Sequence, residues 1–167
     1  QVICAPYDPD LSRLADTLAD FATRARSRGL GLVLEFFPWT EVPDLATALW
    51  VTEGSGAGVL ADALHFDRSG SSLDLLAATD PARLPFAHLC DALVHPPYAT
   101  EDLLHAARAE RLPPGEGQID LRAFLRALPP GVPLGLEVPM TRLAATHGSA
   151  AVLARIASAT RALLAGL

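Results

Sequence analysis

Four side chains able to bind a metal ion stand at or near the ends of apolar segments in this sequence. They are Glu35 in LGLVLEFF, Asp62 in GVLADALH, His88 in FAHLCDA and Glu137 in VPLGLEV. A carboxylate in an apolar segment is costly unless another group compensates its charge. Three carboxylates brought together would repel one another unless a divalent cation neutralised them. This set of carboxylate oxygens with one imidazole nitrogen suits Mn²⁺, Mg²⁺, Co²⁺ or Zn²⁺.

Each of these four residues, taken alone, has a more ordinary explanation. A single glutamate at the end of a strand usually caps a helix or pairs with a cation. Four such residues on four separate segments make coincidence a poor explanation. We therefore predict one metal site with Glu35, Asp62, His88 and Glu137 as its ligands.

The chain as a whole predicts alternating strands and helices. Strands are expected at 2–5, 30–37, 58–65, 86–92 and 132–138, and helices at 11–28, 44–52, 73–78, 100–110, 120–128 and 149–165. Asp10 and Asp120 are expected to cap the helices that follow them. Such alternation indicates a parallel sheet. No glycine-rich phosphate-binding sequence follows any strand, which favours an α/β barrel over an open doubly wound sheet.

A barrel would also explain how the four residues meet. In a (β/α)8 TIM barrel the active site lies where the C-terminal ends of the strands converge. A complete barrel needs ~250 residues, whereas this chain has 167. We expect residues 1–167 to form a single domain that supplies about six of the eight units. Because an apolar segment follows Gln1 at once, N-terminal strands are expected to be missing from this chain.

Five segments of the sequence resemble the xylose isomerase-like TIM barrels and, within them, the sugar phosphate isomerase/epimerase family. They are LEFFPWT (34–40), GVLADALHFDRSG (58–70), HLCDA (88–92), RLPPGEGQIDL (111–121) and GLEVP (135–139). They occur in the family's order and cover nearly the whole chain, which corresponds to roughly the C-terminal two-thirds of such a barrel. The Asp-x-x-His and Pro-Gly-Glu-Gly-x-x-Asp-Leu elements are the most specific of them.

The resemblance implies a metal-dependent isomerase or epimerase of a small sugar or sugar phosphate. It assigns the four residues above to one divalent ion, and His65 and Arg111 to substrate binding. The metal would act as a Lewis acid on an enediolate, while Glu35 and Glu137 remove and return the proton next to the carbonyl. The same groups could expel a β-hydroxyl, so a dehydratase of a polyol or cyclic hydroxy acid is the alternative. A third possibility is a degenerate barrel that binds a metabolite or a partner without catalysing a reaction.

Two more residues at predicted strand ends have both a functional and a structural interpretation. Trp39 could stack on the face of a sugar or pack at the rim of the barrel. Arg68 could bind a phosphate or carboxylate of the substrate, or pair with Asp67 or Glu116 to fix the loops.

Asp91 lies in the same segment, 86–92, as His88. Its carboxylate could orient His88 or Arg111, or it could have a structural role.

Composition argues against other classes of function. The net charge is −6, and the scattered basic residues, all of them arginine, form no block that could neutralise nucleic-acid phosphates. This also disfavours a zinc endonuclease for abasic DNA. No apolar run approaches the ~20 residues that cross a membrane, and no signal peptide opens the chain. We expect a cytoplasmic protein with reduced cysteines, a sugar-like substrate, no nucleic-acid or membrane partner, and a homo-oligomer as in the family.

Overall fold

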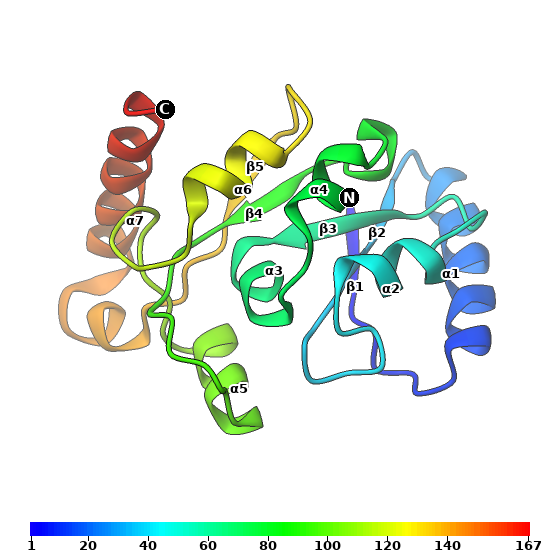
Figure 1. The fold of residues 1–167 in the computed structure, drawn as a ribbon, viewed down its shortest axis with the longest axis horizontal. Helices are drawn as coiled ribbons and strands as arrows, with labels where there is room; N and C mark the ends of the chain where they lie inside the picture. Colours follow the sequence, from blue (N-terminus) through cyan, green and yellow to red (C-terminus); the bar gives the residue numbers. More distant parts are fainter.

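The computed structural model describes residues 1–167 and contains five parallel strands joined by helices (Figure 1). The strands are β1 (Val2–Cys4), β2 (Leu32–Glu35), β3 (Gly58–Asp62), β4 (Ala87–Leu89) and β5 (Leu134–Leu136). The helices are α1 (Leu11–Arg26), α2 (Leu45–Val51), α3 (Ala63–Ser69), α4 (Leu73–Ala78), α5 (Thr100–Arg108), α6 (Leu121–Ala127) and α7 (Thr141–Ala165), with a 3-10 turn η1 (Pro81–Arg83).

The strand order identifies the architecture. The strands lie in the order β1-β2-β3-β4-β5, and every neighbouring pair is parallel. A doubly wound sheet reverses its order at a switch point, and no reversal occurs here. The sheet is therefore part of a barrel, as predicted, although its five strands are one fewer than the six units expected.

The central strands are buried on both faces, and the edge strands are not. All four residues of β2 are buried, which agrees with the continuous apolar run that predicted this strand. Helices α1 and α2 contact each other, as do α2 and α4, and α4 and α6, so these helices form a layer beside the sheet (Figure 1). On β1 and β5, by contrast, Ile3 is 46% exposed and Leu136 is 44% exposed. The partial barrel is open at both edges.

Local sequence signals explain where the first helix begins and ends. The side chain of Asp10 accepts a hydrogen bond from the Arg13 backbone N–H at 3.0 Å, which caps α1 as predicted. The helix buries one face, including Leu14 and Leu18. It ends at Arg26, and Gly29 then adopts a φ of 70°, a conformation that costs glycine little.

Two predicted strands end three residues earlier than expected. The strand expected at 86–92 ends at Leu89, and Asp91 beyond it forms an antiparallel bridge with Leu112. The strand expected at 58–65 ends at Asp62, because the Asp62 carboxylate accepts hydrogen bonds from the backbone N–H groups of Leu64 (2.9 Å) and His65 (3.2 Å) and so starts α3. The helix expected at 149–165 is confirmed as the second part of α7. Non-helical Gly148 separates it from a first part that begins at Thr141 and was not predicted. The remaining helices lie where they were predicted, to within two residues at either end.

None of the helices combines the length and the apolar character needed to cross a membrane.

Candidate metal centre

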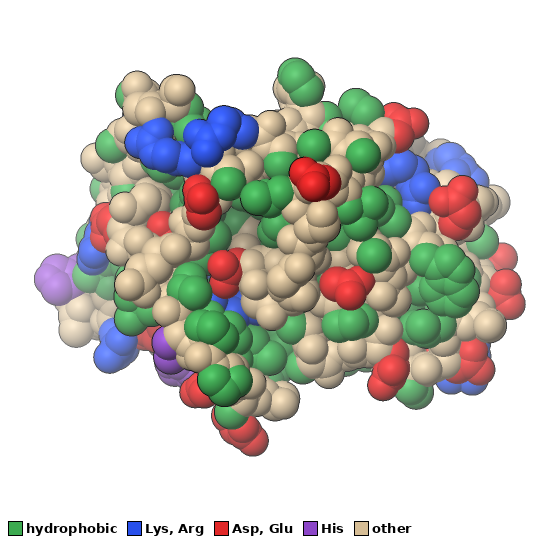
Figure 2. All heavy atoms as spheres, viewed as in Figure 1, with side chains coloured by type: hydrophobic (Ala, Val, Ile, Leu, Met, Phe, Trp, Pro, Cys, Tyr) green, Lys and Arg blue, Asp and Glu red, His purple; other side chains and the backbone are tan.

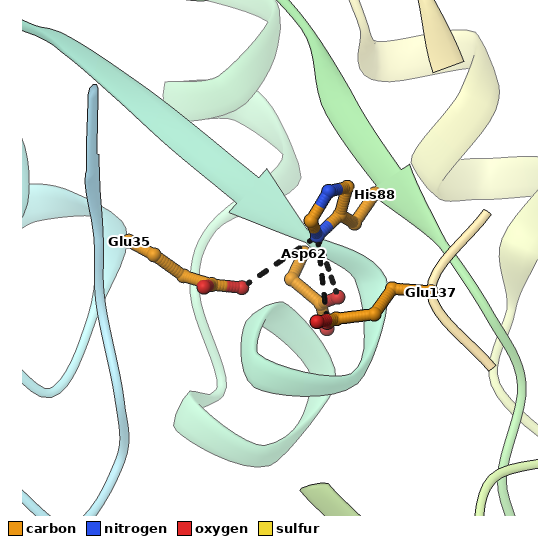
Figure 3. Close-up of side chains that lie close together, drawn as sticks. All are labelled: Glu35, Asp62, His88 and Glu137. Carbon is orange, nitrogen blue, oxygen red and sulfur yellow. Dashed lines mark ion pairs between the residues drawn. The ribbon is translucent and has the colours of Figure 1, made fainter. Parts of the chain in front are cut away.

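The four predicted ligands converge at the C-terminal ends of four neighbouring strands (Figure 3). Glu35 ends β2, Asp62 ends β3, His88 lies in β4 and Glu137 directly follows β5. One ligand atom from each residue lies within 4.8 Å of all the others. His88 Nδ1 is 3.8 Å from Glu35 Oε1, 3.7 Å from Asp62 Oδ2 and 3.5 Å from Glu137 Oε2.

The register of the sheet produces this convergence. Asp62 pairs with His88 across β3 and β4, and His88 pairs with Gly135 across β4 and β5. A Cβ atom at Gly135 would lie 2.9 Å from His88 Cδ2. Glycine at this position therefore leaves the space that the His88 ring occupies.

The chemistry of the cluster fits a divalent cation. Asp62 and Glu35 are buried, and the His88 side chain is 12% exposed. Two of the converging atoms, Glu35 Oε1 and His88 Nδ1, are buried without a hydrogen-bond partner. Such atoms are uncommon in proteins, and buried carboxylates need a compensating charge. A cation among these four residues would satisfy both requirements, so they form a candidate metal site.

Arg111 lies against the same cluster. Its Nη1 atom donates to Asp62 Oδ2 at 2.7 Å and to the Glu137 backbone carbonyl at 3.1 Å, while its Nη2 atom lies 3.0 Å from Glu137 Oε2. The guanidinium is buried. It therefore compensates part of the negative charge and orients two of the candidate ligands. The predicted contact between Arg111 and a substrate stays a prediction.

Burial and the charges of neighbouring groups shift the pKa values of the cluster residues in different directions. Burial raises the pKa of Glu35. Burial also acts to raise the pKa of Asp62, but Arg111, together with His65 and His88, outweighs it and the pKa is lowered. The His88 imidazole lowers the pKa of Glu137. Burial acts to lower the pKa of His88, yet the surrounding carboxylates of Glu137, Glu35 and Asp62 raise it to about 9.

His65 and Trp39 form one wall beside the cluster. His65 Nε2 lies 4.0 Å from Glu35 Oε1, and burial lowers the pKa of this histidine to about 4. Its ring meets Phe37 and Trp39 edge-on, with centroid distances of 4.9 and 5.3 Å. Phe37 and Trp39 stack on each other at 4.9 Å. Trp39 thus packs at the rim, and its contact with a sugar stays a prediction.

A cavity of about 160 Å³ opens beside the cluster. Its lining residues are Tyr7, Glu35, Phe37, Trp39, His65, Ala107, Arg108, Arg111 and Glu137. Of these, Tyr7, Phe37, Ala107 and Arg108 were not predicted. Tyr7 lies beyond the end of β1, so the rule that barrel sites form at strand ends could have indicated it. Arg108 lies at the end of α5, where the sequence carries no comparable signal.

Comparison with known proteins relates this arrangement to solved structures. No family model and no curated protein matches the chain. The IolI protein with a bound zinc atom matches with a TM-score of 0.79 and 21% identity, over 95% of this chain and 60% of IolI. L-ribulose 3-epimerase matches with a TM-score of 0.57 and 20% identity, over 100% of this chain and 61% of the epimerase. The probable 3-DHS dehydratase AsbF from Bacillus anthracis matches with a TM-score of 0.56 and 17% identity, over 75% of this chain and 50% of AsbF.

Several further matches are xylose isomerase domain or xylose isomerase-like proteins. This chain has the fold of a partial xylose isomerase-like TIM barrel. It spans about 60% of the length of IolI, with five strands in half a barrel. At these identities the similarity establishes the fold and leaves the activity to be proposed.

In this partial xylose isomerase-like barrel, Arg68 lies outside the cavity at the metal cluster. Its Nη1 atom pairs with Asp67 Oδ2 at 2.7 Å and donates to the Tyr98 hydroxyl at 2.6 Å, and its Nη2 atom donates to the Leu93 carbonyl at 2.6 Å. The pairing with Asp67 agrees with the structural interpretation. Glu116, the other predicted partner, pairs with Arg155 instead. Substrate binding by Arg68 stays a prediction that these contacts do not favour.

Of the two roles considered for Asp91, the contacts support the structural one. Its carboxylate contacts neither His88 nor Arg111 and instead accepts four backbone hydrogen bonds. They come from Ala92 (2.8 Å), Gly115 (3.0 Å), Gly117 (2.9 Å) and Ile119 (3.1 Å). Asp91 therefore holds the Pro-Gly-Glu-Gly loop of this partial barrel against the end of β4.

That the protein has no nucleic-acid partner stays a prediction. On the face drawn in Figure 2, arginine side chains lie in separate small groups among acidic and apolar ones.

Metal binding should release a proton from His88. With a pKa of about 9 in the metal-free protein, His88 is protonated at pH 7, whereas a metal ligand must be neutral. We therefore expect metal affinity to rise as the pH increases toward 9. Calorimetric titration of Zn²⁺ in buffers of different ionisation enthalpy would count the protons released. The His88→Gln variant should release about one proton fewer per metal ion, and equal proton release by both proteins would contradict the assignment.

Proposed function

We propose that this chain forms part of a divalent-metal-dependent isomerase or epimerase acting on a small sugar or sugar phosphate. One observation carries the proposal: four potential ligands from four successive strands meet at the C-terminal end of a barrel sheet. That is where TIM-barrel enzymes have their active sites. The fold similarity to L-ribulose 3-epimerase and to zinc-bound IolI supports it.

Glu35, Asp62, His88 and Glu137 are the residues that would hold the ion. Their mixture of oxygen and nitrogen donors suits Mn²⁺, Co²⁺, Mg²⁺ or Zn²⁺, and the zinc bound to IolI supports the last of these. When bound, the ion would supply Lewis acidity, which stabilises the negative charge left on adjacent substrate oxygens by proton removal.

Glu35 and Glu137 supply the proton transfers. Their carboxylates approach Asp62 and His88 from opposite sides (Figure 3). One carboxylate removes the proton from the carbon next to the substrate carbonyl, and the other donates a proton back. Return to the opposite face of the same carbon inverts it and gives an epimer. Return to the neighbouring carbon moves the carbonyl and gives an isomer.

Dehydration of a polyol or cyclic hydroxy acid is the second candidate. It begins with the same proton removal but ends with loss of a β-hydroxyl. The fold similarity to the probable dehydratase AsbF supports it. The products differ, because only dehydration yields water together with an enone or a deoxy compound.

Proton exchange with solvent tests both reactions at their shared step. The purified protein, loaded with Mn²⁺, Co²⁺ or Zn²⁺, would be incubated in D2O with a panel of ketoses, aldoses, their phosphates and cyclic hydroxy acids. We expect NMR to show deuterium entering next to the carbonyl of at least one compound, and a chelator to stop it. Absence of exchange across the panel in the metal-saturated protein would contradict the proposal.

A further inference from the structure

Arg108 is a cation at the mouth of the cavity that no acidic residue of the chain neutralises. Its Nη2 atom donates to the Tyr7 hydroxyl at 3.3 Å, a contact between residues 101 positions apart in the chain. The side chain is exposed, and it pairs with no carboxylate, although most other arginines near the site do. Arg108 and Tyr7 line the same cavity as Glu35 and Glu137.

Arg111, the other guanidinium at this cavity, already forms ion pairs with residues of the cluster. It is buried and binds Asp62 and Glu137. Arg108, by contrast, forms no ion pair, and its guanidinium donates only to the Tyr7 hydroxyl. It is therefore the guanidinium of this cavity that can still bind an anion.

The remaining walls of the cavity explain where that anion would lie. Tyr7, Phe37 and Trp39 form a continuous aromatic surface, with centroid distances of 5.9 Å and 4.9 Å between successive rings. Such rings suit the carbon skeleton of a small substrate, not its charged end. At the outer end of this surface, the Tyr7 hydroxyl and the Arg108 guanidinium offer hydrogen-bond donors. The cavity, about 160 Å³, suits a small molecule that reaches from the cluster to the mouth.

We propose that Arg108, assisted by the Tyr7 hydroxyl, binds an anionic group at the end of the substrate remote from the metal cluster. The substrate is accordingly a sugar phosphate or a sugar acid and not a neutral sugar. This rests on the proposed function, since it concerns the substrate of the same site. The planar guanidinium can donate two parallel hydrogen bonds to either a phosphate or a carboxylate.

Three ligands that differ at one carbon test the proposal: D-glucose, D-glucuronate and D-glucose 6-phosphate. Calorimetric titration of the metal-loaded protein would give the dissociation constant of each. We expect at least one anionic ligand to bind about tenfold or more tightly than glucose. A preference for glucuronate would identify a carboxylate site, and one for the phosphate a phosphate site.

Two arginine variants make the test specific. Arg108→Gln should abolish the preference for the anion. The matched control is Arg161→Gln, since Arg161 is also exposed on a helix and forms no ion pair, and this variant should keep the preference. Equal binding of all three ligands by the wild-type protein, including binding of none, would overturn the proposal. So would a preference that survives in Arg108→Gln.

The proposed function and this inference can fail separately. A Zn²⁺ titration of the same samples reports on the four-residue cluster, and Arg108→Gln should leave it unchanged because Arg108 is not a ligand. If Zn²⁺ does not bind, the proposed function fails, while a preference for the anion that depends on Arg108 in the metal-free protein still supports the anion site. If Zn²⁺ binds and no anion is preferred, only the anion site is overturned.

Discussion

The Asp62→Asn substitution should lower the free energy of unfolding of the metal-free protein by about 3–5 kcal/mol. Asp62 is fully buried, and its Oδ2 atom pairs with Arg111 at 2.7 Å. Asparagine keeps the oxygen that accepts from the N–H groups of Leu64 and His65, so the cap of α3 survives. What the substitution removes is the charge opposite a buried guanidinium. Urea denaturation with a chelator present would measure the loss without any contribution from bound metal.

Two further variants isolate the buried pair. Asp120→Asn makes the same chemical change at an exposed cap, where the side chain accepts from the Ala123 N–H at 2.9 Å, and should cost less than about 1 kcal/mol. In Asp62→Asn, Glu137 is the one carboxylate that still pairs with the buried Arg111. Adding Arg111→Met removes this buried cation and should restore part of the lost stability. If Asp62→Asn costs no more than Asp120→Asn, the ion pair does not contribute as described.

The Glu137→Gln substitution should slow exchange of the substrate proton by about 10²- to 10⁴-fold, the usual contribution of a positioned acid or base. Glutamine has nearly the same shape but cannot accept the proton. The Glu137 side chain is 47% exposed, so the variant should fold. Deuterium incorporation, measured by NMR at a metal concentration that saturates the variant, would report the proton transfer and not the metal affinity.

A glutamate elsewhere in the same half of the chain provides the control. Glu116 pairs with Arg155 at the surface, so Glu116→Gln should leave exchange unaffected. Unchanged exchange in Glu137→Gln would remove this residue from proton transfer, and Glu35 would then have to act with another group.

The four candidate ligands could be predicted from the sequence because each is a polar residue in or next to an apolar strand. Parallel strands bring their C-terminal ends to one edge, so Glu35 and Glu137, about 100 positions apart in the chain, meet without any knowledge of side-chain geometry. The positions of the strands followed from the same apolar runs. Their ends did not, because the Asp62 carboxylate starts a helix inside the run that continues to His65.

The groups around the cluster could not be predicted in the same way. Asp91 resembles the ligands in its place after a strand, yet its oxygens face the backbone of the loop at 115–119. Arg108 acquires its place at the cavity only because the end of α5 packs near Tyr7. Both depend on how loops fold back over the sheet, for which residue type and spacing carry no signal.

The central claim is that Glu35, Asp62, His88 and Glu137 bind one divalent ion. Titration of the metal-free protein with Co²⁺, followed by its visible absorption, tests it most directly. Outer-shell substitutions at metal sites commonly weaken binding by about 10- to 100-fold, and loss of a ligand should cost more. The account predicts one Co²⁺ per chain in the wild-type protein and binding weakened by more than about 100-fold in Glu35→Gln. Absence of Co²⁺ binding, or equal affinity in the two proteins, would contradict it.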